Sequence, residues 1–208
     1  MRKRRAKGQD MDQMSRRGFI GAGVALAASG AMAGVITSDI QASTLKASKT
    51  TPLGLYLSPT AAHQAMVQDP EILFVDVRDP IEITFVGHPQ GLDKIIPLNV
   101  ATHAVHPQSG QYQMAANPNV VAEFEALFRS KGKSQSAPLF VTCRSGSRSA
   151  TAARLLIKAG FTNVWNLTEG FEGDKNGNGA RAVNGWRNRG LPWGYKLAEG
   201  VAWNRHSA

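Results

Sequence analysis

Short apolar runs that alternate with helical stretches limit how this chain can fold more than any other feature. Residues 72–77, 95–100, 139–142 and 163–167 form the apolar runs, and residues 58–69, 117–132 and 150–159 form the helical stretches. Nearly continuous apolar runs are typical of buried parallel strands. The alternation predicts an α/β fold, with a central parallel sheet of about five strands flanked by helices on both faces.

The only cysteine, Cys143, directly follows the run 139–142 and opens the loop Cys143-Arg144-Ser145-Gly146-Ser147-Arg148. Ligands of parallel sheets bind at the carboxyl ends of the strands. The helix predicted to start at Ser149 offers unpaired N–H groups and a partial positive charge to an anion. Two arginines add permanent cations, so we expect the thiolate to be favoured. A buried apolar cysteine is the alternative, and its polar neighbours argue against it.

Other segments of the chain carry a family resemblance in the same order. They are ILFVDVRDPIE at 72–82, Gly87-His88, GFTNV at 160–164, Gly185-Trp186 and Gly190-Leu191-Pro192. Together with the cysteine loop, these segments resemble the rhodanese (sulfurtransferase) family from about residue 58 to residue 193. The resemblance implies a rhodanese-like fold that closes with a strand near 160–164 and a last helix near 185–192.

The same resemblance implies roles for the residues of the loop. Cys143 is expected to be the catalytic nucleophile. Substrate contacts are expected from the residues that follow it, namely Arg144, Ser145, Gly146, Ser147, Arg148 and Ser149. Their backbone N–H groups would surround the sulfur, and the two arginines would attract an anionic donor.

The length of the loop separates sulfur transfer from phosphoryl transfer. Four residues lie between Cys143 and Arg148, whereas the cysteine phosphatases that resemble rhodaneses have a loop longer by one residue. We therefore expect a Cys143 persulfide, formed from thiosulfate or a related donor and discharged to a thiol or cyanide acceptor. A noncatalytic binding module is the alternative, and a phosphatase or arsenate reductase is less favoured.

A chain with one cysteine has no second thiol to resolve a disulfide or persulfide. Whatever sulfur Cys143 accepts must therefore leave on another molecule. We expect no cofactor and no metal.

The N-terminal residues resemble a twin-arginine export signal. Ser15-Arg16-Arg17-Gly18-Phe19-Ile20 precedes an uncharged, Ala- and Gly-rich stretch that ends in Ala31-Met32-Ala33. We predict a signal peptide over 1–33, with cleavage after 42 as the alternative, and a periplasmic location. A retained anchor that faces the periplasm is the less favoured alternative. In both cases the membrane is contacted only through this segment.

The remaining boundaries follow from composition. We predict a linker over 34–54, the rhodanese-like domain over 55–195 and a C-terminal tail over 196–208. The net charge of +9 is uneven, because seven of the 24 basic residues and two of the 15 acidic ones precede residue 34. No basic stripe with interleaved aromatic residues follows, so we do not expect nucleic-acid binding.

Two insertions depart from the spacing of the family, at 88–116 and at 173–182. The first contains a predicted polar loop with His103 and His106, which we interpret as surface histidines. The second contains Asp174, Asn176, Asn178 and Gly179, the first half of a calcium-loop pattern whose last position falls on Gly185. We interpret it as a glycine-rich turn, suited to act as a lid or to dock a periplasmic protein.

Several conspicuous residues are predicted to be structural. Asp76 and Arg78 are expected to form an ion pair at the end of a strand. We interpret the tryptophans as packing residues; they are Trp165, Trp186, Trp193 and Trp203.

Overall fold

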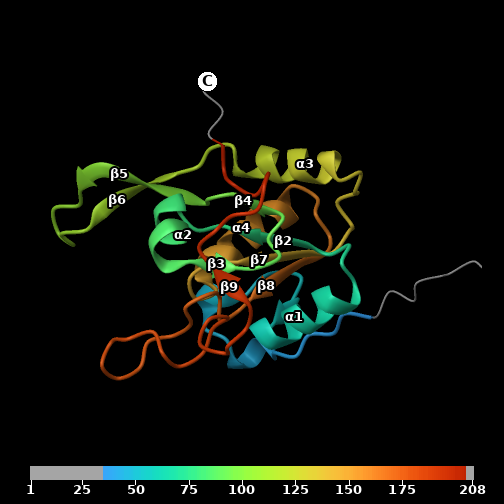
Figure 1. Cartoon of the computed structure of the whole chain (residues 1–208), viewed down its shortest axis with the longest axis horizontal. Coiled ribbons are helices and arrows are strands. Elements are labelled where there is room, and N and C mark those ends of the chain that lie inside the picture. Colours follow the sequence, from blue (N-terminus) through green and yellow to red (C-terminus); the bar gives the residue numbers. More distant parts are fainter. Residues whose placement is uncertain (1–34, 205–208) are drawn as a thin grey trace, which may run out of the picture. The chain divides into compact units, whose positions relative to one another are not determined.

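The computed structural model describes residues 35–204 (Figure 1). The predicted signal peptide over 1–33 and the last residues, 205–208, lie outside this range. Within the described range, no helix combines the length and the apolar character needed to cross a membrane.

A five-stranded parallel sheet forms the centre of the domain and confirms the predicted fold. Its strands run in the order β1-β8-β7-β2-β4. Their bounds are β1 (Tyr56–Leu57), β2 (Leu73–Asp76), β4 (Lys94–Ile95), β7 (Leu139–Thr142) and β8 (Val164–Leu167). The strand predicted over 95–100 is shorter than expected. Beyond β4, the N–H groups of Ile96 and Leu98 still donate to the carbonyls of Asp76 and Val77, both at 3.0 Å, before the chain leaves the sheet.

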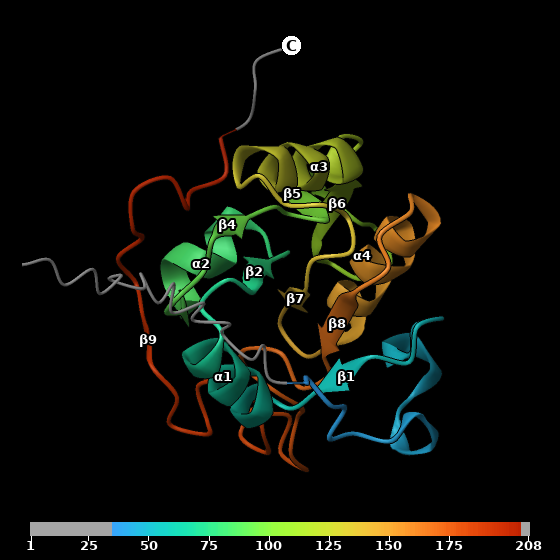
Figure 2. The same ribbon diagram turned by 90° about the vertical axis from the view of Figure 1, so that its right-hand side faces the viewer.

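Helices cover both faces of this sheet, as predicted (Figure 2). One face packs against α3 (Val120–Ser130) and α4 (Ser147–Lys158), and the other against α1 (Pro59–Gln68) and α2 (Pro80–Val86). Side chains alternate along each strand, so Leu73 and Val75 enter the first layer and Phe74 enters the second. Both layers are apolar, which explains why the strands read as continuous apolar runs.

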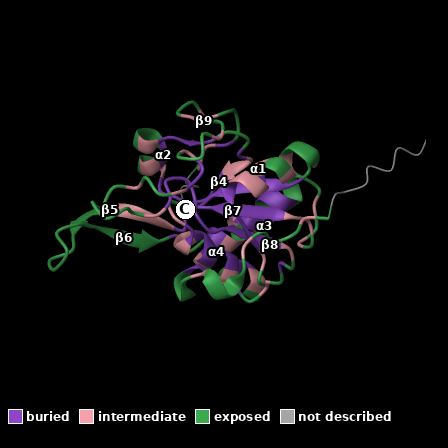
Figure 3. Cartoon of the chain, turned by 90° about the horizontal axis from the view of Figure 1, so that it is seen from below, coloured by how far each residue is buried: buried purple, intermediate pink, exposed green. Residues whose placement is uncertain are grey.

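Two small antiparallel pairs lie outside the main sheet. β3 (His88–Pro89) pairs with β9 (Trp193–Gly194), and β5 (Asn99–Val105) pairs with β6 (Tyr112–Ala116). The second pair is a hairpin where we predicted a polar loop. Its tip closes with hydrogen bonds between His106 and Gln111 and from Gly110 N–H to the His106 carbonyl, with Gly110 at a positive φ of 64°. The hairpin projects from the domain and is largely exposed (Figure 3).

The predicted last helix near 185–192 is a series of turns instead. Gly185 and Gly190 both have positive φ angles, of 100° and 68°, which a regular helix does not tolerate. Trp186 is fully buried, and its Nε1 donates to the Pro192 carbonyl at 2.8 Å. The tryptophan therefore serves packing, as predicted.

The segment before the sheet differs from the linker that we predicted. It contains the short 3₁₀ helices η1 (Ala42–Thr44) and η2 (Ala47–Lys49). The Ser38 hydroxyl donates to the Tyr56 carbonyl at 2.7 Å, and Asp39 accepts from the Ser58 backbone N–H at 2.8 Å. These hydrogen bonds hold the segment on the domain.

The described part of the predicted tail also contacts the domain. Ile95 N–H donates to the Val201 carbonyl at 2.9 Å, beside the edge strand β4. Trp203 Nε1 donates to Glu123 on α3 at 2.9 Å. The tail thereby shields an edge that could otherwise pair with another chain.

Candidate active site

The loop that carries Cys143 connects the end of β7 to α4. The helix begins at Ser147, two residues earlier than we predicted, because Gly146 forms its N-cap in the left-handed region at φ 94°. A Cβ at this position would overlap the carbonyl oxygen of Thr168. Glycine is therefore required here for both its backbone angle and the close approach of another chain segment.

The Cys143 thiol faces the first turn of α4. Gly146 N–H donates to Sγ at 3.1 Å, and the Ser149 hydroxyl donates to it at 3.3 Å. Cys143 is 1% exposed. Among the described residues, these two groups of the predicted set 144–149 donate to the unmodified Sγ; the contacts that we expect for a persulfide sulfur stay a prediction. Ser149, predicted as the start of the helix, lies inside it and contacts the sulfur.

The segment after β8 fixes the backbone of the loop. Phe171 N–H donates to the Cys143 carbonyl at 2.8 Å, and the N–H groups of Glu172 and Gly173 donate to the Arg144 carbonyl at 2.9 and 3.1 Å. A Cβ on Gly170 would lie 2.5 Å from the Cys143 oxygen. The two segments are thus in direct backbone contact, which holds the thiol in place.

Asn166 connects the N-terminal segment to the same loop, and no local sequence pattern marks it as a site residue. Its Nδ2 donates to the Gly146 carbonyl at 3.1 Å and to the Lys49 carbonyl at 2.9 Å. Asn166 is fully buried in β8. Beside this contact, the hydroxyls of Ser147 and Ser48 lie 3.4 Å apart. Ser147 therefore contacts the N-terminal segment.

Arg148 forms a bidentate pair with Glu82 on α2. Its two terminal nitrogens lie 2.5 and 2.7 Å from the carboxylate oxygens. Burial disfavours the charge on both groups, but the hydrogen bonds and opposite charges outweigh it, so the pKa of Glu82 is lowered and the pKa of Arg148 is raised. Cys143 and Asp76 add to the raised pKa of Arg148. Glu82 already neutralises the cation that we expected to attract the donor.

Arg144 has a different environment. Its Nε donates to Glu172 at 2.8 Å, and its side chain is 45% exposed. Among residues 35–204, its two terminal nitrogens have no hydrogen-bond partner. Of the two predicted arginines, Arg144 therefore has donors available to an incoming anion. Ser145 lies in the turn between the strand and the helix, where its backbone nitrogen faces Gly170.

Asp76 and Arg78 form the predicted ion pair, which is fully buried. Arg78 Nε donates to both carboxylate oxygens at 3.0 Å, and one terminal nitrogen donates to the Gly87 carbonyl at 2.9 Å. The guanidinium lies over the ring of Phe171, 4.4 Å from its centroid. Because Phe171 donates its N–H to Cys143, this pair supports the loop indirectly.

An open cavity of about 330 Å³ borders the loop at Arg144 and Arg148. Its lining residues come from α2, the hairpin and the loop, and they are Asp79, Ile81, Glu82, Asn99, Ala101, Met114, Arg144 and Arg148. Asp79 connects two of these elements, because its carboxylate accepts from Ile81 N–H at 2.8 Å and from Ala101 N–H at 2.6 Å. The hairpin residues were missed from the sequence, where only Asp79 before Pro80 carried a recognisable signal, that of a helix N-cap.

Residues 58–176 match the family model of the Rhodanese-like domain. The chain belongs to this family. It is 28% identical over 136 residues to thiosulfate sulfurtransferase 16, chloroplastic, of Arabidopsis thaliana, covering 65% of this chain and 89% of that protein. It is also 28% identical over 136 residues to an uncharacterized protein of Rickettsia prowazekii, covering 64% and 92%. The crystal structure of Rv0390 from M. tuberculosis aligns with a TM-score of 0.52 at 30% identity, covering 68% and 97%.

The two predicted insertions of this rhodanese-like domain differ in their relation to the thiol. The first insertion contains β5 and β6, and residues of both strands line the cavity. The second forms a turn in which Lys175 pairs with Arg181 across an isolated β-bridge. Its Asp174 accepts from Lys49 Nζ at 3.0 Å and from Asn184 Nδ2 at 3.2 Å. The first position of the calcium pattern is therefore already paired with a cation, which supports the interpretation as a turn.

The described residues of the rhodanese-like domain contain no group of three or more histidine, cysteine, aspartate or glutamate side chains that could hold a metal ion. His103 and His106 lie on the exposed hairpin, as their interpretation as surface residues requires.

Proposed function

We propose that this protein is an exported sulfurtransferase that moves a sulfane sulfur from thiosulfate, or a related anionic donor, to an external thiol or cyanide. Membership of the rhodanese-like family supports a function of the sulfurtransferase type, and the Arabidopsis relative is named for that activity on thiosulfate. The observation that carries the proposal is the Cys143 sulfur at the start of α4, hydrogen-bonded by Gly146 N–H and the Ser149 hydroxyl.

In the first step, the Cys143 thiolate attacks the sulfane sulfur of thiosulfate. A new S–S bond forms to Cys143, the S–S bond of thiosulfate breaks, and its electron pair leaves with sulfite. The product is a Cys143 persulfide with one negative charge. Gly146 N–H and the Ser149 hydroxyl stabilise the anionic sulfur, because charge-assisted hydrogen bonds are the stronger kind.

In the second step, an acceptor takes the outer sulfur. The acceptor's electron pair forms the new bond to that sulfur, and the electron pair of the persulfide bond returns to Cys143 as thiolate. Because Cys143 is the only cysteine, no thiol of the same chain can perform this attack. The reaction therefore needs a second molecule.

The two arginines of the loop have separate roles in this proposal. Arg148 is held by Glu82 and positions the first turn of α4, while the terminal nitrogens of Arg144, which have no partner within residues 35–204, contact the anionic donor. Both arginines are paired with a carboxylate, which weakens their attraction for an anion. They differ in the donors that remain, because Glu82 takes both terminal nitrogens of Arg148 whereas Glu172 accepts from Nε of Arg144.

The decisive experiment is intact-protein mass spectrometry of the full chain after treatment with thiosulfate. We expect the mass of one sulfur atom on the wild-type protein and none on Cys143→Ser. Circular dichroism of both proteins serves as the folding control. A folded wild-type protein that gains no sulfur would overturn the proposal in favour of a binding module. Hydrolysis of an aryl phosphate that depends on Cys143 would support a phosphatase instead.

Export is a separate part of the proposal and rests on the sequence around Arg16 and Arg17. We expect the full chain to reach the periplasm of a bacterium with a twin-arginine system, and the double change Arg16→Lys and Arg17→Lys to retain it in the cytoplasm. Immunoblots of cell fractions measure the outcome. Equal export of both proteins would contradict a twin-arginine route.

A further inference from the structure

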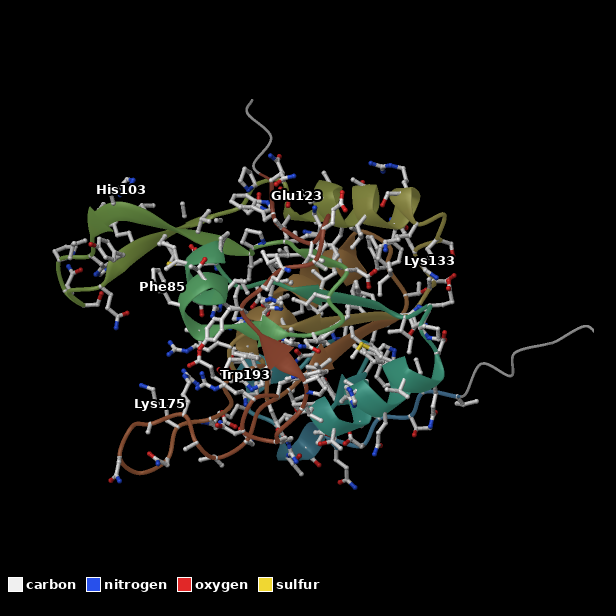
Figure 4. The ribbon with its side chains drawn as sticks, viewed as in Figure 1. Phe85, His103, Glu123, Lys133, Lys175 and Trp193 are labelled. Atoms are coloured by element: carbon white, nitrogen blue, oxygen red, sulfur yellow. The ribbon has the colours of Figure 1, made fainter. Side chains whose placement is uncertain are left out.

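The hairpin β5–β6 presents one of its faces to the thiol loop. Ala101 and Met114 are direct cross-strand partners, and Asn99 lies two residues before Ala101 on the same face. All three line the cavity that borders the loop. Asp79 holds this part of the hairpin through its 2.6 Å hydrogen bond to Ala101 N–H. Figure 4 shows the hairpin, labelled at His103, on the same side of the domain as α2, labelled at Phe85.

The cavity is larger than thiosulfate requires. Its volume is about 330 Å³, whereas a small inorganic anion occupies only a few times the ~30 Å³ that a water molecule takes up in the liquid. Volumes of about 300 Å³ and above are typical of sites for organic ligands. The hairpin therefore builds a space suited to an organic molecule.

The lining has two chemically distinct parts. Ile81, Ala101 and Met114 provide apolar contacts, and Ile81 and Met114 are 57% and 47% exposed. Arg144 provides the two terminal nitrogens that have no partner among the described residues. The carboxylates in the lining do not repel an anion as free charges would, because Glu82 is paired with Arg148 and Asp79 accepts two backbone hydrogen bonds. The lining has equal numbers of carboxylates and guanidiniums, so its contribution to binding a carboxylate is the two terminal nitrogens of Arg144 as hydrogen-bond donors rather than a net positive charge.

We propose that the hairpin selects the sulfur acceptor and that this acceptor is an organic thiol that carries a carboxylate. Its apolar part lies against Met114 and Ile81, and its carboxylate binds Arg144. The cavity borders the thiol loop at Arg144 and Arg148. Because Cys143 itself is almost completely buried, the proposal requires the outer sulfur of the persulfide to be the atom that the acceptor attacks. The acceptor thiolate forms a bond to that sulfur, the persulfide bond breaks, and its electron pair returns to Cys143. The inference rests on the proposed sulfurtransferase function.

The test measures how fast a preformed Cys143 persulfide is discharged, which removes the donor step from the comparison. The wild-type protein is loaded with thiosulfate, desalted and mixed with glutathione or with cyanide. In Met114→Ala we expect the second-order rate with glutathione to fall about fivefold, because apolar contact is lost, while the rate with cyanide changes by less than about twofold.

Gln113→Ala is the matched control, because Gln113 is the exposed neighbour of Met114 on the opposite face of the same strand. We expect it to discharge to both acceptors at the wild-type rates. Equal loss with glutathione and cyanide in Met114→Ala, or no loss with either, overturns the inference. A wild-type protein that cannot be loaded with sulfur contradicts the proposed function itself, so the two failures are distinguishable.

Arg144→Gln tests the charged part of the inference. We expect discharge by glutathione to slow about fivefold relative to discharge by 2-mercaptoethanol, which carries no carboxylate. An unchanged ratio excludes the role of Arg144. If Met114→Ala slows discharge of the persulfide to a protein-borne thiol but not to glutathione, the hairpin is a protein-docking surface and the proposal of a small-molecule acceptor is wrong.

Discussion

The thiol loop and the β5–β6 hairpin face the same cavity but are held in opposite ways. Cys143 and Gly146 of the loop are buried, the carbonyls of Cys143 and Arg144 accept hydrogen bonds from the segment after β8, and glycines at 146 and 170 allow that segment to approach the loop. The base of the hairpin is held by Asp79, and all five residues of β6 are exposed. The contrast suggests separate roles, in which the rigid thiol loop performs the chemistry and the accessible hairpin selects the acceptor.

The largest expected effect comes from Gly146→Ala, which breaks the rigid element. The new Cβ overlaps the Thr168 carbonyl, and alanine would have to adopt a φ angle of 94°, which is strained for any residue other than glycine. We expect a loss of about 3 kcal/mol in the free energy of unfolding and no persulfide formation. Thermal denaturation and mass spectrometry measure the two outcomes.

Gly132→Ala is the control for this prediction. Gly132 also has a positive φ, of 62°, but a Cβ there meets no atom within 4 Å. We expect it to cost about 1 kcal/mol and to leave sulfur loading intact. Equal costs for the two variants would show that the contact with Thr168 is not responsible.

Glu82→Gln removes the charge that neutralises Arg148 while keeping an acceptor for the capping hydrogen bond from Asp79 N–H. We expect a loss of about 2 kcal/mol at neutral pH, because a partly buried guanidinium loses its partner. Urea denaturation measures this change. Glu71→Gln, which removes a carboxylate from the exposed pair with Lys133, is the control and should leave stability nearly unchanged.

The lowered pKa of Glu82 predicts how the difference in stability between the wild-type protein and Glu82→Gln depends on pH. Its value in the folded protein lies below the ordinary 4.5. The stabilisation is therefore complete above about pH 4.5 and is lost as the pH falls through the folded pKa. The difference between the wild-type protein and Glu82→Gln should shrink in acid. A constant difference down to the acid limit of folding would contradict the role of the ionised pair.

The smallest effect is expected from Asp79→Asn, which loosens the hairpin alone. Asparagine caps α2 as well as aspartate does. Ile81 and Ala101 donate to different carboxylate oxygens of Asp79, however, and asparagine has an NH₂ group in place of one of them. We expect a cost of about 1 kcal/mol and faster hydrogen exchange at the Ala101 amide. The amides of α2 serve as the internal control. Equally accelerated exchange in α2 would show that the substitution disturbs the helix rather than the hairpin.

The sequence predicted those parts of the fold that depend on neighbouring residues. The strand Leu139–Thr142 was placed with its observed bounds, because an apolar run between Pro138 and the polar loop leaves little choice. The start of α4 was misplaced because Ser149 resembles an N-cap, whereas Gly146 takes that position and Ser149 donates to Cys143. A local pattern does not reveal which of two suitable residues the tertiary structure selects.

The electrostatics of the site could not be predicted from local sequence. Arg144 pairs with Glu172, 28 residues away, and Arg148 pairs with Glu82, 66 residues away. Both pairs form only when strands β2, β7 and β8 lie side by side. The hairpin was missed for a related reason, because its two strands lie outside both core clusters and therefore show little of the apolar pattern by which buried strands are found.

The hydrogen bonds of Ser38 and Asp39 are relevant to where a proposed signal peptide would be cleaved. Ser38 donates to the carbonyl of Tyr56 and accepts from its N–H on the edge strand β1, and Asp39 binds Ser58, the N-cap of α1. A peptidase that cut after Ala42 would remove both residues and expose that edge. A cut after Ala33 would leave them in the mature protein. If the proposed export signal is cleaved, the folded domain favours the earlier of the two cleavage points, and the mature N-terminus would be a structural part of the protein rather than a remnant of export.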